Sequence, residues 1–424
     1  LQKEIFMTVM NNIKRSNDIF AVIDIGNTKV SSLIGSSAKN NDVQVKVLGF
    51  GQHASLGIAN GIVTDMREIA NSIAKAVEGA ETMAGFPINN VTCSLSGGRP
   101  IIKVTRNELQ IENGQVTKND LAKIEKMNKP KIIEDYKLLS SSVIKYYIDN
   151  NTPVDNPIGI HTDKLIVEVS NSYGKKGVIK NISSAIDLCH LSIDKFTLCS
   201  EASGVSTLIE DERTNGAIVI DLGGNLTSIG VFINKKIIFS DSIPIGGIHI
   251  TSDIVRGLGT KAEDAEKIKI LYGSALSNET DEYTKIDVPI ISDDGEIINQ
   301  KIPKAMLTAI IKPRIEEIFE IVKERLKFLK LSKNSINKVV LCGGGANLNY
   351  IREFASFYLS TNVRIGRPIG LIDIPEIVHT PTFSCLTGLL IKSLQQEKTL
   401  ISNNQNLGFL NYFGRIGNWL DENL

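Results

Sequence analysis

The sequence has few residues that bind transition metals, and these are scattered. Its five histidines and five cysteines show no H-E-x-x-H, C-x-x-C or comparable ligand spacing, and zinc sites need such clusters. An odd number of cysteines, mostly in apolar surroundings, is typical of small core residues in a reducing cytosol. The sequence therefore argues against a transition-metal site and against a disulfide framework.

Two common nucleotide-binding signatures are also missing. The chain contains neither G-x-x-x-x-G-K-[ST] nor G-x-G-x-x-G, so neither a P-loop nor a Rossmann domain is supported. No apolar run reaches the length of a transmembrane helix. Basic and acidic residues balance at 47 each, so we expect no nucleic-acid partner.

The length predicts more than one domain. At 424 residues the chain is too long for a single hydrophobic core. The first 18 residues mix Lys, Asn and Ser without the apolar segment of a signal peptide. We expect them to form a disordered leader.

One stretch, residues 217–232, carries the strongest functional signal. An apolar strand ends at Asp221, a tight turn contains Gly223 and Gly224, and a second apolar strand follows. Backbone N–H groups at such a turn can close over phosphate oxygens, because glycine adds no side-chain bulk. The aspartate beside the turn is suited to holding a hydrated divalent cation.

The same design occurs near the N-terminus, over residues 20–34. An apolar strand leads to Asp24, then Gly26 and Thr28, and an apolar strand leaves the turn. One such hairpin is a weak signal, because Asp and Gly are ordinary turn residues. Two copies about half a chain apart predict a duplicated domain with a phosphate between the copies.

Two further glycine clusters let the backbone approach a ligand closely: the pair Gly246 and Gly247, and the triple glycine 343–345 that follows an apolar strand. Glu266 and Lys269 are three residues apart on an expected helix and so share a face. Such a pair is usually solvated surface charge. Beside a nucleotide it could instead hydrogen-bond the ribose hydroxyls and the base.

Helix signals are clear in two other places. Thr64 or Asp65 can cap a helix that runs to about Ala84, whose apolar positions recur every three or four residues and should cover the first sheet. A long amphipathic helical segment is expected over 303–329, broken or kinked at Pro313.

The pattern changes between Ser96 and Asn181. A helix is expected to start at Thr117, and it alternates with short strands at 101–104, 109–111 and 165–170. This predicts a small α+β insertion. It carries no phosphate-loop or catalytic pattern, which suggests protein contact; a packing subdomain without a partner is an equally open alternative.

In their order along the chain, these features are similar to those of the actin/Hsp70/sugar-kinase ATPases. Within that superfamily the chain resembles the FtsA family of bacterial cell-division proteins from about Ile19 to the C-terminus. The motifs that carry the resemblance are Asp24-Ile-Gly-Asn-Thr-Lys-Val30, Ser203 to Asp221, Gly246 to Gly273, Ile311-Lys-Pro-Arg314, Val363-Arg-Ile-Gly-Arg-Pro368 and Ser384-x-x-x-Gly-Leu-Leu390. The insertion, with Asn156-Pro-Ile-Gly159, resembles that family's extra subdomain.

The resemblance implies an α/β fold with duplicated actin-like (ribonuclease H-like) ATPase domains around a nucleotide cleft. A small α+β insertion lies in the first half and an amphipathic helix at the C-terminus. The predicted parts are a leader over 1–18, a first actin-like domain over 19–95 and 182–215, the insertion over 96–181, a second actin-like domain over 216–392, a flexible linker over 393–406 and a membrane-targeting helix over 407–424.

The resemblance also implies that the cleft binds ATP with Mg²⁺. Asp24 and Asp221 would hold the hydrated metal and be linked to catalysis. The residues expected to contact the nucleotide are Gly26, Asn27, Thr28, Lys29, Gly223, Gly224, Asn225, Thr227, Gly246, Gly247, Glu266, Lys269, Gly343, Gly344 and Gly345.

Two residues depart from the family pattern. This chain has Asn225 where a third glycine is usual, and Ser228 where an aspartate is usual. Asn tolerates positive φ, so the turn survives. With one carboxylate fewer near the metal, the sequence predicts a nucleotide-gated switch that is at most a slow ATPase.

The C-terminal stretch 407–424 is amphipathic. Phe409, Phe413, Ile416 and Leu420 fall on one helical stripe beside Trp419, the only tryptophan in the chain. Such a face behind a polar linker suits an interfacial membrane helix, and the family resemblance favours this over a helix docked on the protein's own core.

The resemblance implies an adaptor that polymerises into actin-like filaments and ties the tubulin-like filament protein FtsZ to the cytoplasmic face of the inner membrane at the septum. Arg314 and Glu317 match family positions that receive the FtsZ C-terminal peptide; a solvated helix face is the ordinary alternative. The insertion would meet later division proteins.

Three rival functions stay open. One is a pilus-assembly adaptor of the PilM type, which would not be expected to end in an amphipathic anchor. Another is a sugar kinase, which needs a general-base aspartate, for which Asp253 is the nearest candidate. A shape-determining filament protein of the MreB type is less favoured, because the insertion and the tail argue against it.

Overall fold

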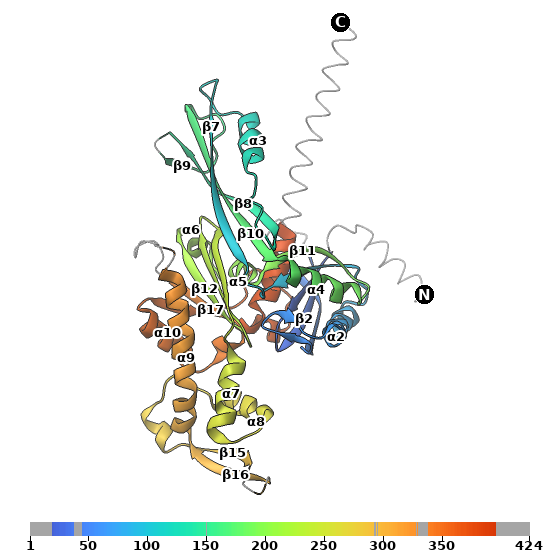
Figure 1. Ribbon diagram of the computed structural model, residues 1–424, viewed down its shortest axis with the longest axis vertical. Helices are drawn as coiled ribbons and strands as arrows, with labels where there is room; N and C mark the ends of the chain where they lie inside the picture. The colour runs from blue at the N-terminus through green and yellow to red at the C-terminus, as the bar shows by residue number, and fades with distance from the viewer. Residues whose placement is uncertain are drawn as a thin grey trace.

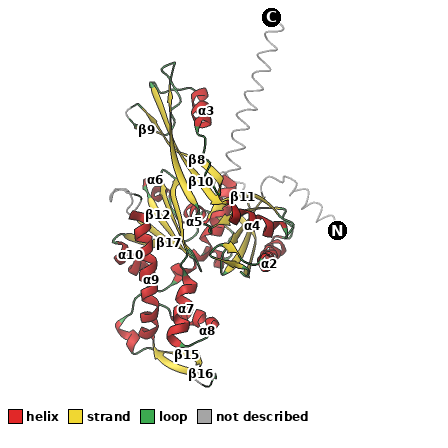
Figure 2. Cartoon of the chain, viewed as in Figure 1, coloured by secondary structure: helices red, strands yellow, loops and turns green. Residues whose placement is uncertain are grey.

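The structure is a computed structural model that describes residues 19–37, 45–149, 151–291, 294, 296–327, 329 and 338–395. Two mixed sheets with helices against them form the body, and a third sheet projects from it (Figures 1 and 2). The predicted leader, the C-terminal helix and all but the first three residues of the linker lie outside the described residues.

The first sheet has the strand order β11-β6-β1-β2-β3-β19. β1, β2 and β3 form an antiparallel meander, β6 runs parallel to β1 and β11 runs parallel to β6. The central strand is apolar on both faces, with Val22 and Ile23 fully buried, as expected for a strand covered on both sides. The bounds are β1 Ile19–Ile25, β2 Lys29–Ser37, β3 Val45–Ala54, β6 Asn90–Leu95, β11 Ser192–Leu198 and β19 Leu371–Ile372.

The second sheet repeats this arrangement in the order β14-β13-β12-β17-β18. Here too three antiparallel strands are followed by two parallel ones, so it matches β3-β2-β1-β6-β11 strand for strand. The duplication predicted from the two hairpins is thereby confirmed. The bounds are β12 Ala217–Leu222, β13 Thr227–Ile233, β14 Lys236–Ile243, β17 Lys338–Cys342 and β18 Asn362–Ile365.

Helices cover the first sheet and connect the two halves. Asp65 caps α2 by accepting hydrogen bonds from the backbone of Arg67 and Glu68, and the helix ends at Ala84, as predicted. Its apolar face packs with α4 against β1. The helices of the first half and of the connection are α2 Met66–Ala84, α4 Lys176–Asp187, α5 Cys199–Thr207 and α6 Glu210–Asn215; β4 Ile58–Ala59 and β5 Ile62–Val63 form a short hairpin beside them.

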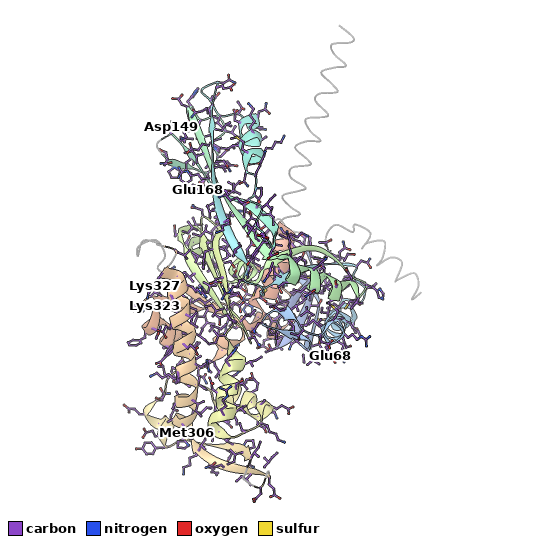
Figure 3. The ribbon with its side chains drawn as sticks, in the orientation of Figure 1. Glu68, Asp149, Glu168, Met306, Lys323 and Lys327 are labelled. Carbon is purple, nitrogen blue, oxygen red and sulfur yellow. The ribbon has the colours of Figure 1, made fainter. Side chains whose placement is uncertain are left out.

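The second half carries additional elements between β14 and β17. The sequence predicted a break or a kink at Pro313. α9 is one continuous helix through Pro313, so the break is absent, and Ile311 and Ile315 on either side are buried in one core. The bounds are α7 Gly247–Leu258, α8 Ala262–Tyr272, η1 Glu279–Glu282, β15 Lys285–Ile291, β16 Ile297–Pro303 and α9 Lys304–Lys327, with η2 Gly344–Asn347 and α10 Ile351–Leu359 following β17. Figure 3 marks the length of α9, from Met306 near β16 to Lys323 and Lys327.

The projecting sheet is formed by residues within the predicted insertion. Its order is β7-β10-β8-β9, with α3 beside it, and Asp149 lies near its far end (Figure 3). Three details differ from expectation: β7 is a single long strand, and neither β8 nor β9 was predicted. Ser170 of β10 donates a hydrogen bond to the carbonyl of Ile237 at 2.6 Å, so this sheet also contacts β14 of the second half. The bounds are β7 Ile101–Gln110, α3 Lys118–Met127, β8 Tyr136–Ile148, β9 Thr152–Val154 and β10 Lys164–Lys175.

The last described segment returns to the first half, although the predicted boundary assigned it to the second. β19 pairs with β3, and the helix over 384–395 buries Leu386, Leu389 and Leu390 against the face of the first sheet. Two short turns, η3 Glu376–His379 and η4 Pro381–Phe383, lead into this helix. This segment is far in sequence from the other strands of the first sheet, so a local sequence pattern cannot show that it packs there.

Gly388 lies directly against the backbone of α5. A Cβ atom built on Gly388 would lie 1.8 Å from the carbonyl oxygen of Ala202. We predict that Gly388→Ala lowers the free energy of unfolding by about 2–3 kcal/mol, because two helices must move apart. Thermal unfolding measures this. The control is Gly177→Ala in α4, whose added Cβ would meet nothing within 4 Å; an equal loss there would contradict the explanation.

Candidate functional site

The two predicted hairpins have the same turn geometry. The backbone N–H of Gly26 donates to the carbonyl of Lys29 at 3.0 Å, and that of Gly223 donates to Leu226 at 3.0 Å. In register, Asp24 lies opposite Ser31 and Asp221 opposite Ser228. Each sheet therefore ends in the same short loop with one aspartate at its base.

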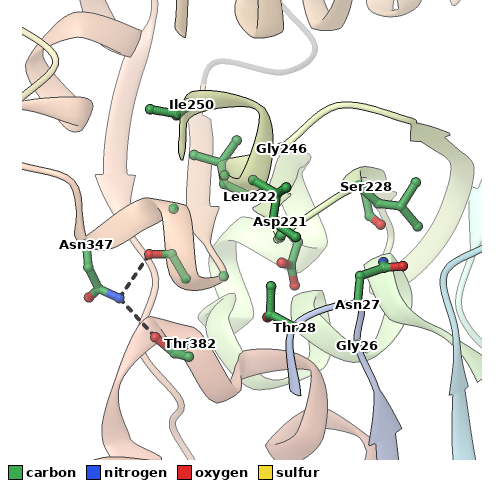
Figure 4. A pocket seen from close by; sticks show the side chains of 18 of the residues that line it. Gly26, Asn27, Thr28, Asp221, Leu222, Ser228, Gly246, Ile250, Asn347 and Thr382 are labelled. Atoms are coloured by element: carbon green, nitrogen blue, oxygen red, sulfur yellow. Dashed lines mark hydrogen bonds between the residues drawn. The ribbon is translucent and has the colours of Figure 1, made fainter. Parts of the chain in front are cut away.

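The two loops face each other from the two halves of the molecule. A Cβ atom on Gly224 would lie 2.5 Å from Cγ2 of Thr28, so the loop tips touch. Between them opens a cavity of about 430 Å³ (Figure 4), within the range of small-molecule sites. Asp24, Asp221 and Lys29 all line it.

The predicted glycine pair completes the second loop. Gly247 and Ile248 donate backbone hydrogen bonds to the carbonyls of Gly223 and Gly224 at 3.0 and 2.9 Å. A Cβ atom on Gly246 would lie 2.5 Å from the carbonyl oxygen of Gly223. Only glycine fits there, and α7 starts directly against the loop.

Asp221 is a buried carboxylate, only 8% exposed. Burial raises its pKa and so does the negative charge of Asp24, while a hydrogen bond from Ser203 Oγ, 2.6 Å from its Oδ2 atom, acts in the opposite direction. Gly343, with φ of 81°, passes so close that a Cβ atom would lie 2.3 Å from the Asp221 Oδ1 atom. The triple glycine thus makes room for this carboxylate.

Lys29 brings a positive charge into the cavity. Burial lowers its pKa to about 8, while the charges of Asp24 and Asp221 oppose that shift. Its Nζ atom lies 3.6 Å from the centre of the Phe383 ring, a cation–π contact, and that ring packs edge-on against Phe50.

Glu266 and Lys269 both line the cavity, and both side chains already form hydrogen bonds within the protein. Lys269 Nζ donates to Glu266 at 2.7 Å, to Thr251 Oγ1 at 2.8 Å and to the carbonyl of Gly247 at 3.0 Å. Thr251 also donates to Glu266. This network joins α8 to the first turn of α7 and fixes both charged side chains at the cavity wall.

The structure adds a wall that local sequence patterns did not reveal. Its members come from α7, α8, α9, η2 and η4 and from the residues that follow β6 and η2. They are mostly apolar; the polar ones are Ser96, Thr382 and Asn347, which donates to Thr382 Oγ1 at 2.9 Å (Figure 4). They are Ile248, Ile250, Ile270, Ile315, Ile318, Phe319, Leu348, Ser96, Asn347 and Thr382. Isoleucine on an amphipathic helix is an ordinary core residue, so no local signal marked these positions.

Two predicted residues do not line the cavity. Thr227 is buried, and its Oγ1 atom donates to the carbonyl of Ile245 at 2.8 Å. It therefore joins the end of the second loop to the residue before Gly246 and does not face the cavity. Asn225 sits at the loop tip, and its Oδ1 atom is buried without a hydrogen-bond partner. The other predicted residues of the two loops and the two glycine clusters all line the cavity.

The predicted peptide-binding pair lies elsewhere, on α9. Arg314 holds Asp253 of α7 through two hydrogen bonds, Nε to Oδ2 at 2.7 Å and Nη2 to Oδ1 at 2.9 Å, and also contacts Glu317. Neither Arg314 nor Asp253 lines the cavity. The predicted membrane-targeting residues Phe409, Phe413, Ile416, Trp419 and Leu420 lie outside the described residues.

Two duplicated sheets with facing D-x-G loops define the class of actin-like ATPase folds, and solved structures agree on the fold. A PilM–PilN type IV pilus biogenesis complex is 14% identical with a TM-score of 0.59, covering 88% of this chain and 98% of that one. MreB5 of Spiroplasma citri bound to ADP is 14% identical with a TM-score of 0.53, covering 90% and 98%. The predicted fold class is thereby confirmed.

Sequence relatives then identify the family. The family model for cell division protein FtsA matches residues 218–388, and the model for the SHS2 domain inserted in FtsA matches residues 97–172. The cell division protein FtsA of Rhizobium meliloti is 32% identical over 96% of this chain and 95% of its own length. That of Neisseria meningitidis is 34% identical over 90% and 91%. The chain belongs to the FtsA family of cell division proteins.

Family membership decides against the pilus-assembly adaptor and the shape-determining filament protein as descriptions of this chain. The resemblance inferred from the motifs is confirmed. Among the described residues, no helix is long and apolar enough to cross a membrane.

The electrostatics of the cavity give a direct prediction. Asp24→Asn removes a negative charge that raises the pKa of Lys29, so this pKa should fall below about 8. The pH dependence of Lys29 acetylation, followed by mass spectrometry, measures it. Asp264→Asn, which removes a carboxylate outside the cavity lining, should leave the Lys29 profile unchanged. A profile that Asp24→Asn does not move would show that the two charges do not interact.

Proposed function

We propose that the cavity binds ATP with Mg²⁺. The observation that carries this proposal is the contact between two glycine loops, each with an aspartate at its base and both lining one cavity. Backbone N–H groups at such tips suit phosphate oxygens. Lys29 supplies a positive charge close by, and the apolar wall on α7 and α9 suits a base.

The residues present fit a hydrated magnesium ion. Mg²⁺ keeps several waters and is usually held by one or two carboxylates together with the phosphates of its substrate. Asp24 and Asp221 are two such carboxylates on facing loops, and the described residues contain no group of three or more His, Cys, Asp or Glu that would enclose an ion directly. When bound, Mg²⁺ would neutralise phosphate charge.

Within this proposal, hydrolysis is slow. Ser228 stands opposite Asp221, and its hydroxyl is a poor base compared with a carboxylate. A sugar-kinase function is disfavoured because Asp253, its candidate base, is held by Arg314 and does not line the cavity. The chain is better suited to a nucleotide-dependent switch than to turnover.

We further propose that the protein links FtsZ to the cytoplasmic membrane at the division septum. Arg314 and Glu317, both partly exposed on α9, would bind acidic and basic groups of the FtsZ C-terminal peptide. The amphipathic stretch 407–424 would insert into the inner membrane as a peripheral anchor. Self-association into filaments would add avidity to this weak anchor, and the insertion would contact later division proteins.

The nucleotide proposal predicts a magnesium-dependent defect. Asp221→Asn should weaken ATP binding about 10–100-fold in the presence of Mg²⁺, because one charged contact to the hydrated ion is lost. It should have little effect in EDTA. Isothermal titration of the purified chain measures both. Asp264→Asn is the matched control; if it weakens binding as much as Asp221→Asn, or if neither changes it, the assignment of Asp221 is wrong.

The adaptor proposal predicts two separable losses in one vesicle experiment. Vesicles of phosphatidylethanolamine and phosphatidylglycerol are sedimented with FtsZ and the full chain, with and without Mg-ATP. A chain that stops after Asn406 should leave both proteins in the supernatant. Arg314→Glu should still bind vesicles but lose most FtsZ recruitment, at least 10-fold, because its charge is reversed.

The control for the second loss is Lys312→Glu, which reverses a charge on the same helix where Lys312 pairs with Glu316. It should recruit FtsZ normally. Vesicle binding by the truncated chain would refute the anchor, and full FtsZ recruitment by Arg314→Glu would refute the peptide site.

A further inference from the structure

A second cavity adjoins the nucleotide cavity and has no role in the function proposed above. Its volume is about 470 Å³, and residues of both halves and of the insertion line it. Leu226 lines both cavities, so the two spaces share this side chain as a wall. A Cβ atom built on Gly61 would lie 3.1 Å from Leu226 Cδ1, and the Gly61 N–H donates to Asn27 Oδ1 at 2.9 Å. The shared wall is therefore in contact with both nucleotide loops.

The lining of the second cavity is positively charged. Arg99 and Lys175 both line it, and its lining contains no aspartate or glutamate. Tyr136 Oη donates to the carbonyl of Arg99 at 3.1 Å, and Arg99 has a φ of 52°, a conformation that few residues other than glycine adopt. A tyrosine of the insertion thus holds the turn that carries this arginine.

The N-terminus of α4 meets the same cavity. Lys175 is the N-cap residue, and no side chain caps the helix. Gly177 and Val178 line the cavity, and N–H groups in the first turn of a helix have no partner within the helix. A Cβ atom on Gly177 would meet nothing within 4 Å, so its backbone is open to a ligand. Such N–H groups, together with the helix dipole, favour an anion.

Ser242 is an independent observation that a polar ligand belongs in this cavity. Its side chain lines the cavity and is only 5% exposed, yet its Oγ atom has no hydrogen-bond partner. It lies opposite Ser228, a residue of the nucleotide cavity, on the neighbouring strand. A buried hydroxyl without a partner costs free energy. A bound group that accepts its hydrogen would remove that cost.

We propose that the second cavity is a binding site for inorganic phosphate. Arg99 and Lys175 would neutralise its charge, and the N–H groups at the start of α4 and the Ser242 hydroxyl would donate to its oxygens. The choice of phosphate among anions rests on the nucleotide function proposed above, because ATP hydrolysis in the adjoining cavity would produce this ion. The anion site itself does not rest on that function.

The test is isothermal titration of the nucleotide-free full chain with sodium phosphate, with sodium chloride keeping the ionic strength constant. Arg99→Gln and Lys175→Gln should each weaken phosphate binding about 10-fold or more, because a charge-assisted hydrogen bond is lost. Lys176→Gln is the matched control. It removes the neighbouring lysine, which is outside the cavity lining, and should change the affinity by about twofold at most.

Ser242→Ala separates ligand binding from a structural role. Because the Oγ atom has no partner within the protein, the unfolding temperature measured without phosphate should not fall. The phosphate affinity of this variant should fall about 10-fold, because a donor to a charged oxygen is lost. A lower unfolding temperature with unchanged phosphate affinity would overturn the assignment of Ser242.

The remaining outcomes separate this proposal from the nucleotide proposal. The phosphate site is overturned if the unmodified chain binds no phosphate, or if neither Arg99→Gln nor Lys175→Gln weakens binding. Affinity that falls with Lys29→Gln but not with Arg99→Gln places the ion in the nucleotide cavity and also overturns it. Arg99 does not line the nucleotide cavity, so Arg99→Gln should bind Mg-ATP as the unmodified chain does. A chain that binds phosphate but no ATP refutes the nucleotide proposal and supports the phosphate site.

Discussion

The buried carboxylate of Asp221 is the constraint on which most of the cleft depends. A negative charge with 8% exposure is costly unless donors or cations face it. Ser203 supplies a donor from α5, Gly343 leaves the space that any side chain would fill, and Lys29 brings a positive charge from the opposite half. These groups come from three separate parts of the chain, so the carboxylate requires both halves to be folded and docked. In the proposed function, its charge would help to hold a hydrated cation.

The segment 381–395 explains how the halves are held in that relation. Its first residues belong to the cavity wall: the backbone of Gly343 donates to the carbonyl of Pro381 at 2.9 Å, and Asn347 donates to Thr382. Its helix then packs on the first sheet and against α5. One short segment therefore contacts the triple-glycine turn of the second half, carries the Phe383 ring that Lys29 contacts, and packs on the core of the first half. A ligand that changes the separation of the two loops would therefore act on this helix. The stretch proposed to bind the membrane, 407–424, follows this helix in the sequence.

The parts of this site whose residues are contiguous in sequence could be predicted. The parts formed by residues far apart in sequence could not. The loops at Gly26 and Gly223 could be found because strand, aspartate and glycine are contiguous in sequence, and the repeat gave the duplication. The isoleucine wall could not be found, because Ile250 and Ile315 look like any core residue until α7 and α9 are packed together. β8 was missed since its exposure is intermediate along most of its length, which blurs the alternation of a half-buried strand. The sequence placed residues 381–392 in the second domain and 393–395 in the linker, whereas the helix over 384–395 packs on the first sheet. Nothing local indicates which sheet a helix will cover.

The pairing of residues across the two hairpins bears on what the cleft can do. Asp24 faces Ser31 and Asp221 faces Ser228, so the two loops are chemically alike, with one carboxylate and one hydroxyl each. The acidic residues that line the cavity in the described part of the chain are these two aspartates and Glu266, and Glu266 is already bound by Lys269 and Thr251. If both aspartates are engaged with a hydrated cation, no carboxylate is left to take a proton from an attacking water. The absence of a free carboxylate therefore supports the slow turnover that is part of the proposed function.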